Sequence, residues 1–173
     1  MTPKSQLDGF LDAYTPELRK HAQAILKAMR TLVPGARWLV YDNYNALVIA
    51  FSATERVSDI VLSVALYPRW VSMFFMHGTS LPDPTEMLTG SGKGIRHVVV
   101  DDLALLSRRP FRALLRAALE RAEPPIDPHA KHAIVIKSIS KKQRPRRPSG
   151  PTRTAAPRPR AGGRRGSTPS ASR

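Results

Sequence analysis

Acidic residues are missing from the last quarter of this chain. All thirteen Asp and Glu of its 173 residues lie at or before Asp127. Residues 1–128 carry 15 Lys and Arg against 13 acids, whereas residues 129–173 carry 13 Lys and Arg and no acid. We therefore expect a near-neutral folded unit with a cationic extension. Such an extension favours polyanionic partners, of which nucleic acid is the most abundant in a cell.

Cysteine is also missing, which excludes disulfides, thiolate metal sites and thiol chemistry. No apolar run is long enough to span a membrane, and the N-terminal residues lack the basic-then-apolar layout of a signal peptide. These absences predict a cytoplasmic protein with no membrane partner.

A recognisable catalytic arrangement is missing as well. Ser91, His77 or His97, and Asp101 supply the residue types of a hydrolase, but there is no nucleophile elbow. Residues of these types occur in almost any domain, so they carry little weight. We expect a protein that is not an enzyme and that has no cofactor and no metal site.

What the sequence does contain is a regular pattern of apolar residues. From Leu7 to Leu32 they follow the three-and-four spacing of one buried helix face, with Pro16 at the start of the main helix. A second such face lies in residues 110–122. Between these helices, short apolar runs bounded by turn residues predict strands at 37–41, 46–51, 60–66, 71–76 and 95–100.

Consecutive strands joined by short turns are antiparallel, because parallel pairs need long crossovers. The predicted fold class is α+β: a single antiparallel sheet with the N- and C-terminal helices on one face. The domain is assigned to residues 7–123, and residues 129–140 form an arm or edge strand. Residues 141–173 are predicted to be a disordered Arg/Pro/Ser-rich basic tail, because this composition buries too little apolar surface to offset the entropy of ordering.

The tail is the predicted nucleic-acid-binding element, and its cations would contact phosphates without sequence preference. Further partners could be a protein or a small anionic ligand bound by the domain. The candidate tail residues are Lys141, Lys142, Arg144, Arg146, Arg147, Arg153, Arg158, Arg160, Arg164 and Arg165.

A glycine-rich loop is the candidate site for a small anion. Gly90, Gly92 and Gly94 alternate just before a strand, which allows backbone amides to converge on an anion, and Lys93 and Arg96 add charge. We expect at least one of these glycines to have a positive φ. The alternative is a loop shaped by glycine for structural reasons, with both cations solvated or bonded to acids in the 101–102 pair.

This loop belongs to a stretch that resembles the signature of the YdhG-like domain family. That signature runs from a strand through a Leu-x-Asp-Pro loop to Leu-x-Gly-x-Gly-Lys-x-x-Arg-His-Val. The matching positions are Leu81, Asp83, Pro84, Leu88, Gly90, Gly92, Lys93, Arg96, His97 and Val98. The resemblance implies a frataxin-like α+β fold, and most members have no assigned activity. Around Tyr41–Tyr44 the chain departs from the Tyr-Gly-x-Pro common in the family.

Some relatives in that family are described as iron chaperones, so the alternative function is a frataxin-type intracellular iron chaperone. Asp8, Asp12 and Glu17 are its candidate acids, but they lie among more numerous Lys and Arg, which repel a metal cation.

Four aromatic residues could instead form a stacking platform for bases, although aromatic residues in strands usually pack in the core. They are Trp38, Tyr44, Trp70 and Phe74. The sequence favours a non-enzymatic binding module whose cationic tail contacts nucleic acid.

Overall fold

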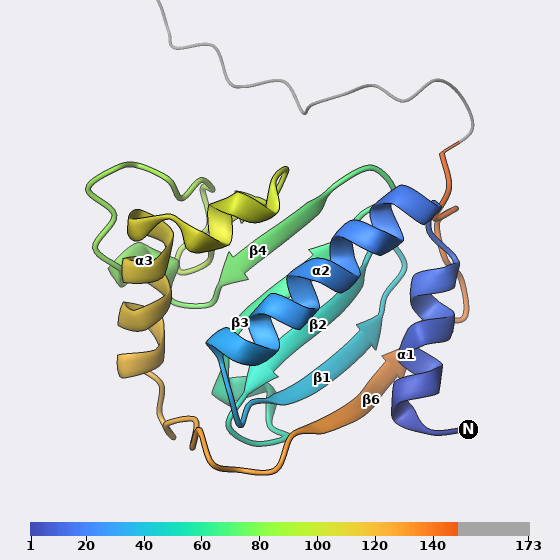
Figure 1. The fold of residues 1–173 in the computed structure, drawn as a ribbon, viewed down its shortest axis with the longest axis horizontal. Helices are drawn as coiled ribbons and strands as arrows, with labels where there is room; N and C mark the ends of the chain where they lie inside the picture. The colour runs from blue at the N-terminus through green and yellow to red at the C-terminus, as the bar shows by residue number, and fades with distance from the viewer. Residues whose placement is uncertain (149–173) are drawn as a thin grey trace, which may run out of the picture.

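The computed structural model describes residues 1–148 of the chain (Figure 1). Three helices and six strands make up this part, and three short 3-10 helices lie between them. The helices are α1 (Pro3–Asp12), α2 (Pro16–Leu32) and α3 (Arg109–Glu120). The strands are β1 (Arg37–Asp42), β2 (Leu47–Ser52), β3 (Ile60–Leu66), β4 (Val71–Phe75), β5 (Arg96–Val99) and β6 (Ala133–Ile139). The 3-10 helices are η1 (Val57–Asp59), η2 (Gly78–Ser80) and η3 (Leu103–Ser107).

Two threonine-proline pairs explain why the N-terminal region forms two helices. Thr2 and Thr15 are the N-caps of α1 and α2, and each side-chain oxygen accepts a backbone N–H three residues later, at 3.1 and 3.4 Å. A proline follows each cap, where its fixed φ suits the first helical turn and its missing N–H costs nothing. The predicted start of the main helix at Pro16 is therefore confirmed.

The sheet is mixed. Its strand order is β5-β4-β3-β2-β1-β6, and neighbours from β1 to β5 pair antiparallel. The connections from β1 to β4 are short, whereas residues 76–95 separate β4 from β5. The last strand, β6, pairs parallel with β1, from Arg37 opposite Ala133 to Asp42 opposite Ile139.

The prediction of a purely antiparallel sheet is therefore wrong for this one strand. The chain leaves α3 and makes a long connection back to the beginning of β1. Such a crossover is what a parallel pair requires, whereas the antiparallel prediction holds only for strands joined by short turns.

One core cluster joins the three helices to the inward-facing side chains of the sheet. Figure 1 shows α2 crossing the sheet, with α1 toward the β6 edge and α3 toward the β4 side. Tyr14, Phe51, Phe75 and Phe111 are among its largest fully buried side chains. The opposite sheet face has a separate small cluster around Leu39.

Candidate nucleic-acid interface

The glycine loop between β4 and β5 adopts the special backbone that the sequence predicts. Gly90 has a φ of 130°, a conformation that side-chain-bearing residues rarely adopt. The expectation of at least one positive φ is thus confirmed. Gly92 and Gly94 have ordinary φ values.

Arg96 is used to hold this loop together. Its Nη1 donates to the carbonyl oxygen of Gly92 at 2.6 Å and to that of Ile95 at 2.8 Å. The side chain therefore binds backbone carbonyls rather than an acid. Lys93, by contrast, is exposed. For Arg96 the geometry favours the alternative, a loop shaped by glycine for structural reasons. Its partners are backbone carbonyls in place of the expected Asp101 or Asp102.

Asp83, which matches the family signature, also organises the loop. Its Oδ1 accepts the backbone N–H of Met87 at 2.9 Å, and its Oδ2 accepts that of Leu88 at 2.7 Å. Gly78 lies so close to Arg96 that an added Cβ would be 2.4 Å from the Arg96 Cβ. Sequence reasoning missed the role of Asp83, although an aspartate followed by proline is a known turn signal.

The end of the expected arm and the first residues of the expected tail pack against the domain. The backbone N–H of Ser140 donates to Asp42 O at 2.8 Å, and that of Arg144 donates to Tyr44 O at 2.9 Å. Gln143 donates from its side chain to the Asp42 carboxylate. Residues 140–148, which we call the C-terminal segment, therefore continue the fold past β6.

Arg146 forms a buried ion pair in this segment. Its Nη2 lies 2.9 Å from Asp42 Oδ1, and the two side chains are only 5% and 7% exposed. The same guanidinium donates to the backbone oxygens of Asn43 and Tyr44. A buried charge pair of this kind is satisfied only because further hydrogen bonds surround it.

Arg147 binds the end of α1. Its guanidinium donates to the backbone oxygens of Asp12, Ala13 and Tyr14, at 2.9, 3.3 and 3.1 Å. These carbonyls stand where α1 ends and helix oxygens lack intrahelical partners.

The structure therefore places Arg146 and Arg147 on the domain, whereas the sequence placed them in a free tail. Among the tail candidates, Lys141, Lys142 and Arg144 have exposed side chains. The remaining candidates lie outside the described residues, as does the predicted disorder beyond residue 148. They are Arg153, Arg158, Arg160, Arg164 and Arg165.

Tyr14 connects two hairpin turns beside this segment. Its hydroxyl accepts the backbone N–H of Leu47 at 3.0 Å and donates to the oxygen of Leu66 at 2.9 Å. These two residues are partners in the β2–β3 register. Burial raises the pKa of Tyr14 to about 12, and the Arg146 charge opposes part of that rise.

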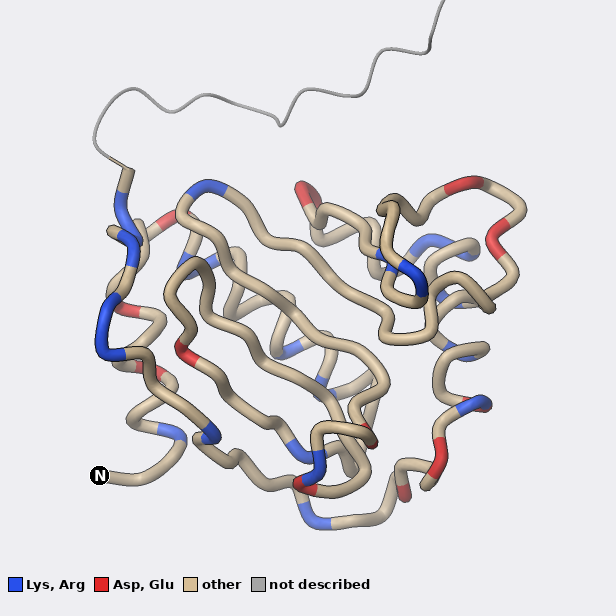
Figure 2. Tube along the Cα trace, turned by 180° about the vertical axis from the view of Figure 1, so that it is seen from behind, with Lys and Arg blue, Asp and Glu red and all other residues tan. Residues whose placement is uncertain are grey.

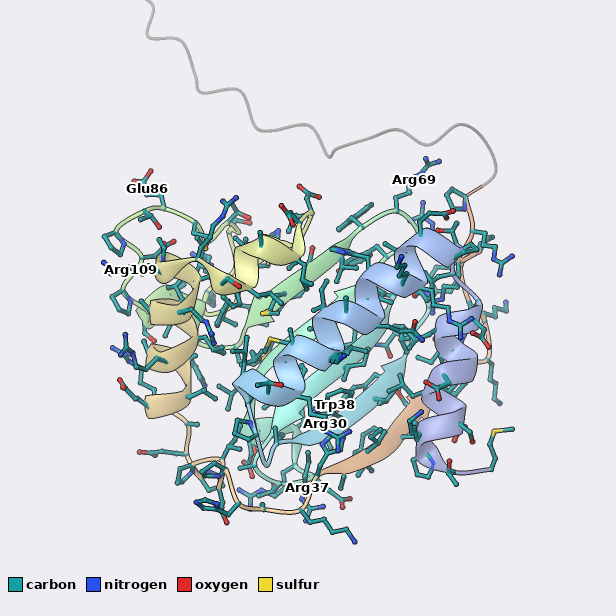
Figure 3. The ribbon with its side chains drawn as sticks, in the orientation of Figure 1. Arg30, Arg37, Trp38, Arg69, Glu86 and Arg109 are labelled. Carbon is teal, nitrogen blue, oxygen red and sulfur yellow. The ribbon has the colours of Figure 1, made fainter. Side chains whose placement is uncertain are left out.

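The turns at 43–46 and 67–70, together with the C-terminal segment, form what we call the hairpin end. Two aromatic side chains are exposed on it: Tyr44 (53%) and Trp70 (38%). Trp70 stacks on Tyr67, with ring centroids 4.8 Å apart. Figure 2 shows basic residues along the C-terminal segment and at the tip of the β3–β4 turn, and Figure 3 places Arg69 there.

The other two aromatic candidates lie elsewhere. Trp38 is 6% exposed and packs in the core, where its ring contacts Phe51 and His132 edge to face. Phe74 is half-buried and stacks on His97. The predicted stacking platform is therefore reduced to Tyr44 and Trp70.

The acids of α1 already have partners. Asp8 pairs with Lys4 at 2.9 Å, and Asp12 pairs with Arg19 at 2.6 Å. Within residues 1–148, no group of three or more His, Asp or Glu side chains is arranged to hold a metal ion. In the same part of the chain, no helix is long and apolar enough to cross a membrane.

Comparison of the chain with protein-family models, with curated proteins and with solved structures gave no match. The resemblance to the YdhG-like family therefore rests on the matching residues between Leu81 and Val98, and family membership stays a prediction.

Proposed function

We propose that this protein is a non-enzymatic nucleic-acid-binding protein of the YdhG-like, frataxin-like type that acts in the cytoplasm. One observation carries the proposal: the last described residues of the acid-free basic region pack at the hairpin end, which has two exposed aromatic side chains. Cations and aromatic rings in one place are what sequence-tolerant binding of single strands requires.

Two of the acids near the hairpin end already have cationic partners. The Asp42 carboxylate is buried against Arg146, and Asp12 pairs with Arg19. Lys141, Lys142 and Arg144 remain exposed. Phosphate groups that approach the C-terminal segment therefore meet these three cations.

Tyr44 and Trp70 suit stacking because each projects from a turn held by the sheet. Trp70 is supported by Tyr67 behind it, and the turn that holds Tyr44 is tied to the C-terminal segment through Arg144 and Arg146. Base stacking on such a ring is worth about 1–3 kcal/mol and tolerates any base.

The salt dependence of binding tests the electrostatic part of the proposal. If about six to eight cations meet phosphates, the log–log salt slope is about −5 to −7 for duplex DNA. A chain that ends at Pro148 keeps Arg146 and Arg147, so we expect it to keep its thermal midpoint and lose most of its affinity.

A truncation at Ser140 does not make this test, because it also removes the buried partner of Asp42. The matched control is Arg112→Gln/Arg116→Gln, which removes two exposed cations from α3 and leaves binding unchanged. Equal DNA affinity for the full chain and the chain ending at Pro148 contradicts the proposal.

The aromatic part is tested with a labelled single-stranded oligonucleotide. Tyr44→Ala and Trp70→Ala should each weaken binding by about 1–3 kcal/mol, whereas duplex binding changes little. Tyr44→Phe keeps the ring and should bind as the natural chain does. Equal losses for single strands and duplex would show that the rings act only through the fold.

A further inference from the structure

A cleft of about 520 Å³ lies between α1 and α2, above β1 and β6. Its floor is apolar and consists of Leu7, Leu11, Leu26, Trp38 and Ile134. The volume is within the range of small-molecule sites, which combine an apolar lining with a few polar groups. Nothing in the proposed nucleic-acid function uses this cleft.

The rim of the cleft is positively charged. Lys4, Lys27 and Arg30 stand on it with one acid, Asp8, which pairs with Lys4 at 2.9 Å. Lys27 and Arg30 are exposed on α2, and Figure 3 shows Arg30 beside Trp38. A ligand with a negative charge is therefore favoured at the mouth.

Two buried polar atoms in the cleft wall lack a hydrogen-bond partner among residues 1–148: Trp38 Nε1 and His132 Nε2. His132 Nδ1 lies 3.2 Å from the carbonyl oxygen of Ala36, so Nδ1 donates and Nε2 is an acceptor in the neutral ring. Burial lowers the pKa of His132, which favours that neutral form.

A buried donor or acceptor without a hydrogen-bond partner lowers the stability of the fold, and Trp38 is only 6% exposed. The cleft wall therefore has one unused donor, the indole N–H, and one unused acceptor, the imidazole nitrogen. A ligand that carries both an acceptor and a donor satisfies both with a small movement of these rings.

We propose that the α1–α2 cleft binds a small carboxylic acid anion with an apolar body and a hydroxyl or N–H of its own. The apolar body covers the leucine and tryptophan floor, the carboxylate faces Lys27 and Arg30, and the polar groups of the ligand pair with Trp38 and His132. The basic C-terminal region of this chain is a poor occupant, because its charge has the same sign as the rim.

The two tryptophans allow a direct test on the full chain. Each gives one indole N–H signal in a nitrogen-15 NMR spectrum, and Trp70 lies at the hairpin end, outside the cleft. Titration with 4-hydroxyphenylacetate is expected to shift the Trp38 signal saturably and to leave the Trp70 signal in place. A Trp70→Phe variant assigns the two signals.

Two controls test the charge of the ligand and of the rim. The uncharged 4-hydroxyphenylethanol, and the variant Lys27→Gln/Arg30→Gln titrated with the acid, should each weaken binding about fivefold or more. Arg112→Gln/Arg116→Gln should leave binding unchanged.

Three results overturn the proposal: no shift of the Trp38 signal, parallel non-saturating shifts of both tryptophans, or equal affinity for the acid and the alcohol. Because the cleft and the hairpin end are separate, failure here leaves the nucleic-acid test unaffected.

Discussion

The glycine loop and the C-terminal segment both contain cations, and in each of them arginine side chains bind backbone carbonyls. In the loop Arg96 binds backbone carbonyls, and in the segment Arg146 and Arg147 do so too. Lys93 in the loop and the two lysines at 141 and 142 are exposed. A planar guanidinium with five donors can satisfy several carbonyls at once, which an ammonium group does less well. A count of Lys and Arg therefore overstates the number of cationic side chains whose donors are free for a partner.

The two regions differ in the groups that their arginines contact. Arg96 meets only neutral carbonyls, whereas Arg146 also faces the buried Asp42 carboxylate. Loss of Arg96 therefore leaves neutral carbonyls without a donor, but loss of Arg146 leaves a charge buried alone. The C-terminal segment should matter more for stability than the loop does.

The largest loss of stability is expected for a variant at Arg146, and it tests the difference between the two regions directly. Arg146→Ala should lower the free energy of unfolding by about 3–5 kcal/mol, because it leaves Asp42 buried and unpaired. Urea denaturation measures it, with Arg144→Ala as the control, since that side chain is exposed. The double variant Asp42→Leu/Arg146→Met should lose less than the single change. A single variant as stable as the natural protein would remove the distinction between the two regions.

Tyr14→Phe should have the next largest effect, about 1–3 kcal/mol, because it leaves Leu47 N–H and Leu66 C=O without their partner. The phenol also predicts a pH dependence. An unfolded chain loses this proton near its ordinary pKa of 10.0, whereas the folded pKa is about 12. Stability contributed by neutral Tyr14 is therefore complete below pH 10 and falls as the pH rises between these values.

Alkaline denaturation checks that the stability falls, and does not rise, with pH in this range. The natural protein should lose stability above pH 10 more steeply than Tyr14→Phe, which has no proton to lose at this site. Tyr44→Phe is the matched control, because that ring is exposed. Identical pH profiles for the natural chain and Tyr14→Phe would contradict the assignment.

Within the glycine loop, Gly90→Ala should cost about 1–3 kcal/mol, because alanine is strained at a φ of 130°. Gly92→Ala is the control, since Gly92 has an ordinary φ and an added Cβ would make only an ordinary contact, 3.9 Å from Ile95 O. Thermal unfolding of both variants separates backbone strain from the loss of a glycine as such. Equal midpoints for the two would show that the loop tolerates a side chain at residue 90.

The smallest change in stability is expected for the exposed lysines. Lys141→Gln/Lys142→Gln should reduce the size of the salt slope for DNA binding by about 2, one per phosphate contact. Lys93→Gln should leave that slope unchanged, and both variants should unfold within about 0.5 kcal/mol of the natural chain. An equal reduction by Lys93→Gln would make the loop part of the interface.

Local patterns in the sequence predicted most of the fold. The helix with Pro16 at its start and the five strands up to Val99 follow from periodicity and turn residues, which act over a few positions. The parallel pairing of β6 depends on where a long crossover brings the chain, and no local pattern encodes that.

The same distinction applies to the candidate site. The positive φ of Gly90 could be anticipated from the spacing of glycines, whereas the pairing of Arg146 with Asp42 joins residues far apart in the chain. The sequence could not show that Tyr44 and Trp70 are exposed while Trp38 is buried, since all three are aromatic residues in or beside strands. Only the assembled sheet decides which rings its turns expose.

The parallel pairing of β6 with β1 has a consequence for the order of folding. During synthesis β1 stays an edge strand until β6 has been made, because no other described strand pairs with that side. The segment that follows then fixes Asp42 and the end of α1. The N-terminal and C-terminal parts of the chain must therefore meet before the fold is complete. Such long-range closure slows folding and leaves a strand edge open to wrong partners until it occurs.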